Sequence, residues 1–509
     1  MTKITRIVTH RFPDLDALLC CWLLRRFGES RYPGIAEVPI DFWNAGDLPE
    51  GKTPEDLERE GTLLVDTGGG RLDTHVLEGD ASGGPAGEDL SAAMLVARDL
   101  GVDRDPKLGQ LLAFSVRQDA RGQSFRSRDP IVHAIGLPGL VRGWAQINEK
   151  EDRKSLDLFC ALMDSLHPVG ADPISSILAS LQTVGDISAG GVKLQSRTVV
   201  DRAVAHWLAN RFPPRVPPSQ ESGETASRAL ARSGRVLDEP AMEKILKLAE
   251  PEFLREKFRA GENLSRELRL TLFGILHGAR QQESSDPLRV ETVGSSLIDS
   301  VYVREQDWFQ AQEDYQDPKK KKCLKLQWGS GPVTLVLVSS TSRAIGRMAR
   351  RIDRPDMVLW LNPDTGHVSV TLSQFTGRLR SFSLAPLAAR FRVAECMRRG
   401  EAVPDIERIM DFGVECGWFL HQSTRILSRG SPKAPDREPT ILTISEMENL
   451  ITTLFEPDRK IDVSLGCPDQ ECTCEECAFF PLRLACCFRH RERLRGTEGM
   501  TLTSREGSP

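Results

Sequence analysis

The sequence predicts an α/β protein with a parallel sheet in its amino-terminal part, and three observations favour this fold class. Short apolar runs typical of buried strands occur at residues 7–8 and 63–65. Apolar residues at helical spacing follow the first run, over residues 17–24. Polar donors, His10 and Asp66, come shortly after these runs. Open α/β sheets bind ligands at the carboxyl ends of their strands, so these donors indicate a functional site there.

The first loop carries three potential metal ligands, His10, Asp14 and Asp16, within seven residues. One imidazole and two carboxylates suit Mn²⁺ or Mg²⁺. A simpler interpretation stands beside this one, in which Asp14 or Asp16 caps the following helix and His10 is an ordinary loop histidine. Because three donors follow one strand, the cluster favours the metal site.

A second group of donors follows the apolar run at residues 63–65. Asp66 is followed by three glycines, residues 68–70, which permit a tight turn before Asp73 and His75. The glycines do not form a P-loop, because no Gly-Lys-Ser/Thr sequence comes after them. Further elements are expected in this part of the chain: a strand at 38–43, a helix at 91–101, and a helix at 108–114 that leads to Asp119.

These residues, in this order, resemble four motifs of the DHH phosphoesterase superfamily. The motifs lie within about the first 130 residues: His10-x2-Pro13-Asp14-x-Asp16-Ala17, Val65-Asp66, Asp73-Thr74-His75, and Asp119. That superfamily includes RecJ exonucleases, oligonucleotide-degrading enzymes, cyclic-dinucleotide phosphodiesterases and manganese pyrophosphatases. The resemblance therefore implies a parallel-sheet domain that hydrolyses phosphate esters.

The resemblance also implies roles for individual residues. A pair of Mn²⁺ or Mg²⁺ ions would be held by His10, Asp14, Asp16, Asp66 and Asp119, with Asp66 between the ions. Catalytic roles would fall to Asp66, Asp73 and His75. The third motif departs from the family, because Thr74 stands where a metal-binding histidine is usual. Either His75 takes over that role, or one ion is weakly held, or the site has lost its chemistry.

Composition narrows the function classes. In a chain of 509 residues, 40% hydrophobic and 27% charged residues predict several globular domains rather than disorder. The formal net charge of -5 means that any nucleic-acid binding must depend on local basic patches. No apolar stretch approaches a signal core or a membrane span, so we expect a cytoplasmic protein without a membrane partner.

The middle of the chain is predicted to be mainly helical, and a second α/β lobe follows it. Helical spacing dominates 155–212 and 239–278, with a proline- and serine-rich break at 213–227. The second lobe is predicted to contain strands at 290–303, 323–328, 333–339, 357–361 and 366–372, and helices at 342–352 and 384–395. This order resembles the substrate-binding lobe of DHH proteins. The candidate phosphate contacts are Arg117, Arg343, Arg347, Arg378 and Arg380, and the alternative is that they are solvated surface charges.

Six of the twelve cysteines lie between residues 467 and 487, which favours a metal site in a reducing compartment over disulfides. Four thiolates at short spacing suit tetrahedral Zn²⁺, and we expect the ligands Cys467, Cys472, Cys474 and Cys477. An iron–sulfur cluster and free thiols are the alternatives.

The predicted organisation has four parts: a DHH-like domain at 1–145, a helical connector at 146–285, a substrate-binding-like α/β lobe at 286–400, and a helical and cysteine-rich module at 401–509. The predicted function is two-metal hydrolysis of a phosphodiester in short or single-stranded nucleic acid, with His75 assisting. The alternatives are a non-catalytic nucleic-acid or nucleotide-binding protein and a small-molecule phosphatase or pyrophosphatase. The oligomeric state is open, and a homo-oligomer is compatible with the sequence.

Overall fold

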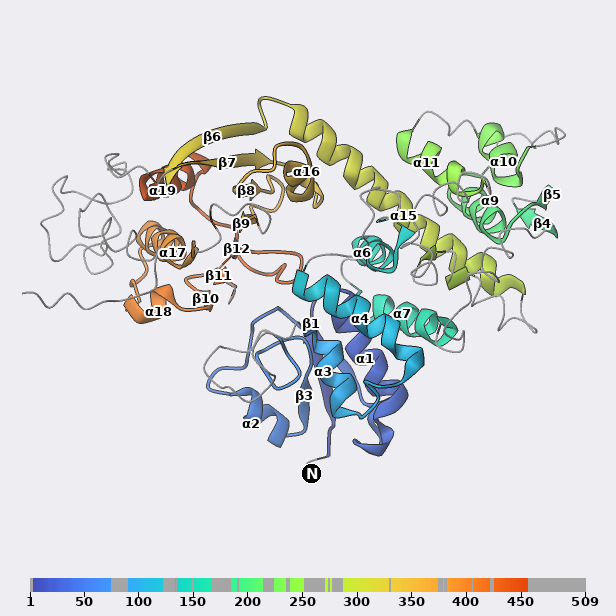
Figure 1. The fold of residues 1–509 in the computed structure, drawn as a ribbon, viewed down its shortest axis with the longest axis horizontal. Coiled ribbons are helices and arrows are strands. Elements are labelled where there is room, and N and C mark those ends of the chain that lie inside the picture. The colour runs from blue at the N-terminus through green and yellow to red at the C-terminus, as the bar shows by residue number, and fades with distance from the viewer. Residues whose placement is uncertain are drawn as a thin grey trace, which may run out of the picture. The chain divides into compact units, whose positions relative to one another are not determined.

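The computed structural model of the chain describes residues 3–74, 90–121, 133, 135–148, 151–166, 185–189, 192–213, 224–234, 239–250, 271–272, 275–276, 287–328, 331–373, 379, 382–404, 406–421 and 425–455. It divides into two compact units, Met1–Phe309 and Gln310–Pro509, which are described separately (Figure 1). The first contains a parallel sheet and the second a mixed sheet, so the predicted α/β class is confirmed. The division into four functional parts stays a prediction.

The first unit is built on a three-stranded parallel sheet with the order β2-β1-β3. Its strands are β1 (Arg6–His10), β2 (Ile40–Trp43) and β3 (Thr62–Leu64). Each strand is short because polar or turn-forming residues follow its apolar run. Successive side chains of a strand point to opposite faces, and both faces of this sheet are buried. Ile7 and Leu63 belong to the main core of the unit, whereas Val8 and Leu64 pack with Leu57 on the other face.

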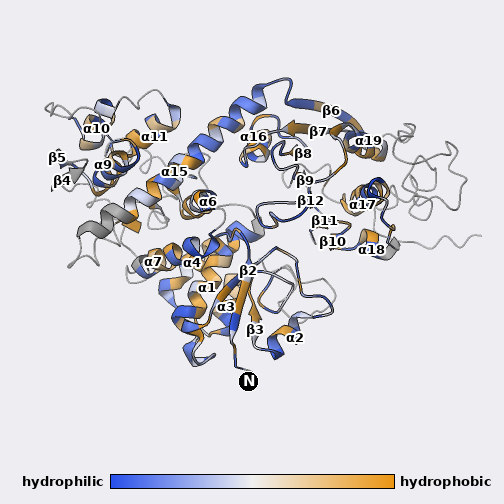
Figure 2. Ribbon diagram, turned by 180° about the vertical axis from the view of Figure 1, so that it is seen from behind, coloured by the Kyte–Doolittle hydropathy of each residue, from blue (hydrophilic) through white to orange (hydrophobic). Residues whose placement is uncertain are grey.

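Two of the helices, α1 and α2, pack against this sheet, and other helices of the unit extend the same core. Helix α1 is apolar along most of its length, and it packs against α3 and α7 (Figure 2). The indole of Trp22 donates a hydrogen bond of 2.9 Å to Asp164 of α7. The helices are α1 (Leu15–Phe27), α2 (Pro54–Arg59), α3 (Ala92–Asp99), α4 (Pro106–Arg121), α6 (Leu137–Ile147), α7 (Asp152–Leu166), α9 (Val199–Arg211), α10 (Ala226–Gly234), α11 (Pro240–Leu248) and α15 (Pro287–Gln316), with short 3-10 turns η1 (Gly28–Ser30) and η2 (Ile35–Glu37).

Two predictions about secondary structure were wrong. Residues 290–303 were expected to be a strand, but they belong to helix α15, in which Leu297, Ile298 and Val301 are buried at helical spacing. The helical stretch predicted at 155–212 contains an antiparallel hairpin of β4 (Gly185–Ala189) and β5 (Val192–Ser196). Two glycines separate these strands in the sequence, which is a hairpin signal that the helical pattern around it obscured.

The second unit contains a seven-stranded sheet with the order β10-β11-β12-β9-β8-β7-β6. Strands β7 and β8 are parallel, and all other neighbours are antiparallel. The strands are β6 (Lys321–Trp328), β7 (Gly331–Ser339), β8 (Met357–Leu361), β9 (Val368–Leu372), β10 (Gly413–Glu415), β11 (Trp418–Leu420) and β12 (Ile426–Arg429). The strands on both sides of residue 400 therefore belong to one sheet.

The described helices of the second unit are α16 (Ile345–Ile352), α17 (Ala385–Arg399), α18 (Ile406–Met410) and α19 (Ile444–Phe455), and the last three contribute to its main core. Helix α17 buries two arginines whose guanidinium groups bind backbone carbonyls. Arg390 donates to the carbonyl oxygen of Leu450 and Arg392 to that of Ile409. These bonds join the helix to distant parts of the unit. None of the helices in the described part of the chain has both the length and the apolar character needed to cross a membrane.

Candidate metal centre

The candidate centre lies at the point of the parallel sheet where the strands that follow β1 in the chain are added first on one side of it and then on the other. Strand β1 has β2 on one side and β3 on the other, so the loops after β1 and β3 leave the sheet next to each other. Ligand sites of open α/β sheets form at such a point, outside the carboxyl ends of the strands. His10 is the last residue of β1, and Asp66 comes two residues after β3. The sheet order thus brings together two side chains that are distant in the sequence.

His10 is held in one orientation by the backbone beside it. Its Nδ1 atom lies 2.9 Å from the carbonyl oxygen of Arg11. A carbonyl oxygen only accepts, so Nδ1 carries the hydrogen, and Nε2 is left to face the carboxylates. Histidines that bind metals commonly donate their second ring nitrogen in this way, which fixes the ring. The side chain is only 2% exposed.

Asp14 has two roles in the same loop. Its Oδ1 atom accepts hydrogen bonds from the backbone N–H groups of Asp16 and Ala17, at 3.1 and 3.4 Å, and so caps α1. The capping role, which was one of the two interpretations of this residue, is confirmed. The same oxygen also lies 4.0 Å from Nε2 of His10. The cap therefore orients the carboxylate toward the histidine, and it does not exclude a metal-binding role.

Asp66 reaches the histidine from a turn that needs glycine. Its own backbone has φ 51°, a left-handed value that aspartate tolerates better than most residues. Gly68 has φ 74°, and an added Cβ atom there would lie 2.8 Å from the side chain of Leu64. The turn closes when Asp73 accepts a hydrogen bond of 2.9 Å from the N–H of Gly69. As a result, Oδ2 of Asp66 stands 3.3 Å from Nε2 of His10.

Three donors thus gather in one place. One ligand atom each from His10, Asp14 and Asp66 lies within 4.8 Å of the other two. Donors that bind one ion at about 2.1 Å lie about 3–4 Å from each other, so small side-chain rotations are enough to clasp a cation. One imidazole and two carboxylates fit Mn²⁺ or Mg²⁺ chemically.

Asp16 is not part of this group of three, and its carboxylate binds the start of α3. Its two carboxylate oxygens accept hydrogen bonds from the N–H groups of Ala92 and Ala93, at 2.7 and 3.2 Å, and from the hydroxyl of Ser115. Burial, followed by the charges of Asp66 and Asp119, raises the pKa of Asp16 well above its usual range. In this arrangement Asp16 holds α3 and α4 against the centre.

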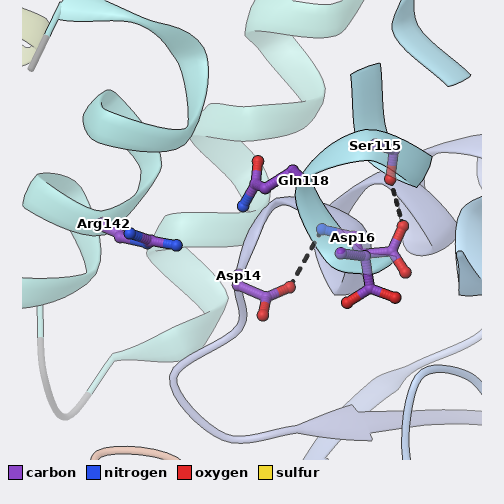
Figure 3. Close-up of a pocket in the computed structure, with 6 residues that line it drawn as sticks. Asp14, Asp16, Ser115, Gln118 and Arg142 are labelled. Carbon is purple, nitrogen blue, oxygen red and sulfur yellow. Dashed lines mark hydrogen bonds between the residues drawn. The ribbon is translucent and has the colours of Figure 1, made fainter. Parts of the chain in front are cut away.

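A pocket of about 150 Å³ adjoins the centre, and three of its lining residues escaped the sequence analysis (Figure 3). Asp14, Asp16 and Asp119 supply carboxylates, while Ser115, Gln118 and Arg142 are the residues that were missed. Ser115, Gln118 and Asp119 occupy positions i, i+3 and i+4 of helix α4, so one face of this helix meets the pocket. That spacing was a usable signal. Arg142 comes from α6, and nothing in its local sequence marks it.

The other predicted site residues are distributed as follows. Asp73 is buried and braces the glycine turn, and Thr74 donates a hydrogen bond of 3.3 Å to Asp119. The guanidinium of Arg117 lies over the ring of Phe114, 5.2 Å from its centroid. Arg343 and Arg347 lie in the second unit. The remaining predictions concern residues outside the described part of the chain: His75, Arg378, Arg380, Cys467, Cys472, Cys474 and Cys477.

The chain was also compared with family models, with curated proteins and with solved structures, and no match was found in any of the three. The resemblance to the DHH superfamily therefore rests on the four sequence motifs around His10, Asp66, Asp73 and Asp119 alone and stays a prediction.

Proposed function

We propose that this protein is a divalent-cation-dependent phosphoesterase that hydrolyses phosphodiester bonds in short or single-stranded nucleic acid. The observation that carries the proposal is the group of His10, Asp14 and Asp66 beside a pocket at the edge of the parallel sheet. The substrate class is supported by the resemblance of the four sequence motifs to those of DHH phosphoesterases.

The chemistry follows from what each side chain does. A divalent cation bound by the three donors would supply Lewis-acid polarisation of a phosphoryl oxygen and lower the pKa of a water molecule. His10 and Asp14 are oriented for binding by the carbonyl of Arg11 and by the start of α1. The described residues gather donors for one cation. The second expected ion stays a proposal, which depends on Asp119 and on His75.

A second candidate function is a nucleotide-binding protein that has lost hydrolysis. It is favoured by Thr74, which stands in place of the usual histidine and donates its hydroxyl to Asp119. Position 74 thus offers Asp119 a neutral hydroxyl where the family has an imidazole. With one cation only, the leaving oxygen of an in-line displacement would have no second stabilising charge.

One experiment tests the first proposal. Mn²⁺ is titrated calorimetrically into the full-length protein, which is then incubated with labelled RNA, single-stranded DNA, a cyclic dinucleotide and pyrophosphate. We expect Mn²⁺ binding and hydrolysis of at least one nucleic-acid substrate. Asp66→Asn keeps the shape of the side chain but removes its charge. It should lower Mn²⁺ affinity by more than about a hundredfold and abolish turnover.

The matched control is Asp157→Asn, which removes a carboxylate from the exposed side of α7, where Asp157 pairs with Arg153. It should leave both readouts unchanged. Mn²⁺ binding with nucleotide binding but without turnover would favour the second candidate. Absence of Mn²⁺ binding by the wild-type protein would overturn the phosphoesterase proposal.

A further inference from the structure

Arg142 is the one cationic residue among the described residues that line the pocket. It extends from α6 toward Asp14 and Gln118, as Figure 3 shows. Within the described part of the chain, its guanidinium forms neither a hydrogen bond nor an ion pair within 4 Å. Burial lowers the pKa of Arg142, and the charge of Asp14 acts in the opposite direction with a smaller effect. A half-buried guanidinium of this kind has donors to offer to a ligand.

The packing of two helices fixes Arg142 in place and strengthens its field. An added Cβ atom at Gly143 would lie 2.2 Å from the carbonyl oxygen of Ser300, so α6 and α15 touch at this glycine. The contact brings Arg304 of α15 near Arg142. Burial, followed by the charge of Arg142, lowers the pKa of Arg304 to about 10. With a pKa of about 10, Arg304 is charged at neutral pH, and it adds positive charge beside Arg142 although it does not itself line the pocket.

Gln118 adds a neutral group to the same pocket. Its Oε1 atom is buried, and no hydrogen bond reaches it from the residues that the structure describes. In Figure 3 the amide lies near Arg142 and Asp14. An unsatisfied buried amide costs stability unless a ligand or water completes it. Arg142 and Gln118 thus offer N–H donors, and Gln118 also offers an acceptor for a hydroxyl.

The charges around the pocket favour a phosphoryl group as the ligand, and they favour its binding only when a cation is bound. Asp14 and Asp119 repel an anion as long as no cation neutralises them. A cation bound by His10, Asp14 and Asp66 offsets the charge of Asp14 and so weakens that repulsion. Arg142 then has no carboxylate charge of Asp14 to neutralise it and can attract an anion. A phosphoryl group has several anionic oxygens, so it can meet the cation and the planar fork of an arginine at once. A pocket of about 150 Å³ has room for one phosphoryl group, with the rest of the substrate outside.

We propose that Arg142, with Gln118 beside it, binds the phosphoryl group of the substrate, and that phosphate and the divalent cation bind cooperatively. This inference rests on the proposed function and deepens it, because it names the group that holds the reacting phosphate. The proposed phosphate-binding residues therefore lie on α6 and α4 of the first unit.

The test uses the full-length protein with Mn²⁺ and inorganic phosphate as probes. Calorimetry first measures Mn²⁺ affinity alone, and then phosphate affinity with Mn²⁺ or with EDTA. We expect wild-type protein to bind phosphate at least about tenfold more tightly with Mn²⁺. Arg142→Met should weaken that binding about tenfold to a hundredfold, because a charged hydrogen-bonding partner is lost. Its Mn²⁺ affinity should not fall, because the substitution removes a repelling charge.

Two further variants keep the result interpretable if Arg142→Met does not fold. Arg142→Lys should restore part of the affinity, and Gln118→Leu should weaken phosphate binding about tenfold. The matched control Arg153→Gln removes an exposed arginine of α7 and should change nothing. If Mn²⁺ binds but phosphate affinity is the same in wild type and the Arg142 and Gln118 variants, the inference is wrong and the metal centre stands. If the wild type binds no Mn²⁺, both the inference and the proposed function are overturned.

Discussion

The Nε2 atom of His10 lies 3.3 Å from Oδ2 of Asp66, and both side chains are only 2% exposed. Burying a carboxylate against an imidazole is costly unless other charges or hydrogen bonds compensate for the lost water. The sheet nevertheless places this pair at the edge where β1 and β3 end. The glycine turn and the left-handed backbone of Asp66 also position its carboxylate next to His10. This placement supports the cation site that we propose.

The first prediction concerns the histidine itself. His10→Ala removes the only nitrogen donor of the group, so Mn²⁺ affinity should fall by more than about a hundredfold. Calorimetric titration measures the change. His206→Ala is the control, because His206 lies on α9 and contacts Asn210 instead of the centre. Equal losses in the two variants would mean that the effect comes from general destabilisation.

The second prediction concerns a residue that positions the histidine loop. Phe12 has φ 51°, and its N–H donates a hydrogen bond of 2.9 Å to Oδ1 of Asp152 at the start of α7. Asp152→Ala removes the acceptor that holds this unusual backbone, so the orientation of His10 should relax and Mn²⁺ affinity should fall about tenfold to a hundredfold. Asp152→Asn keeps an oxygen acceptor and should restore most of the affinity. If the amide variant is as weak as the alanine variant, the hydrogen bond is not what positions the loop.

Short sequence patterns were enough to predict the three candidate metal ligands. His10 and Asp14 share one loop between a strand and a helix, and Asp66 follows a second apolar run, so strand endings were enough to find them. The side chains of His10 and Asp66 come together only because the strand order is β2-β1-β3, an order found in parallel α/β sheets. Asp16 follows two residues after Asp14, in the first turn of α1, but it faces α3, because the orientation of a side chain depends on what packs against it.

The position of Arg142 in the site depends on a contact that no local pattern contains. Arg142 reaches the pocket because Gly143 lets α6 approach α15, and these helices are far apart in the sequence. The misassigned residues 290–303 show the same limit. Valine and isoleucine in that stretch resemble a strand in composition, whereas the spacing of the buried residues is helical.

The third prediction tests that helix contact directly. Gly143→Ala forces a Cβ atom against the backbone of Ser300, which should destabilise the first unit by about 1–3 kcal/mol. It should also displace Arg142 and weaken phosphate binding. Hydrogen exchange of peptides from α6 and α15 in increasing urea measures the stability. Gly109→Ala on α4 is the control, since no described residue outside its own helix lies within 4 Å of the added Cβ, and the change should stabilise by up to about 1 kcal/mol. Similar effects of both substitutions would contradict the close helix contact.

The fourth prediction concerns the pH dependence of the second unit. Burial lowers the pKa of His367 from its ordinary value, the charge of Arg343 lowers it further, and a hydrogen bond with the backbone of Arg437 acts in the opposite direction. The folded protein then binds this proton less readily than the unfolded chain, whose histidines titrate near about 6.5. The stability that results is complete above that pH and is lost as the pH falls through the lower pKa of the folded state.

His367→Gln should therefore flatten the decrease in stability below about pH 6.5, because glutamine does not titrate. The ring of His367 packs on Gly430, so the variant loses some stability at every pH, and the slope with pH is the informative quantity. Hydrogen exchange in peptides of β9 and β12, compared between variant and wild type at each pH, measures this slope. An unchanged slope in the variant would assign the acid sensitivity of this unit to its carboxylates instead of to His367.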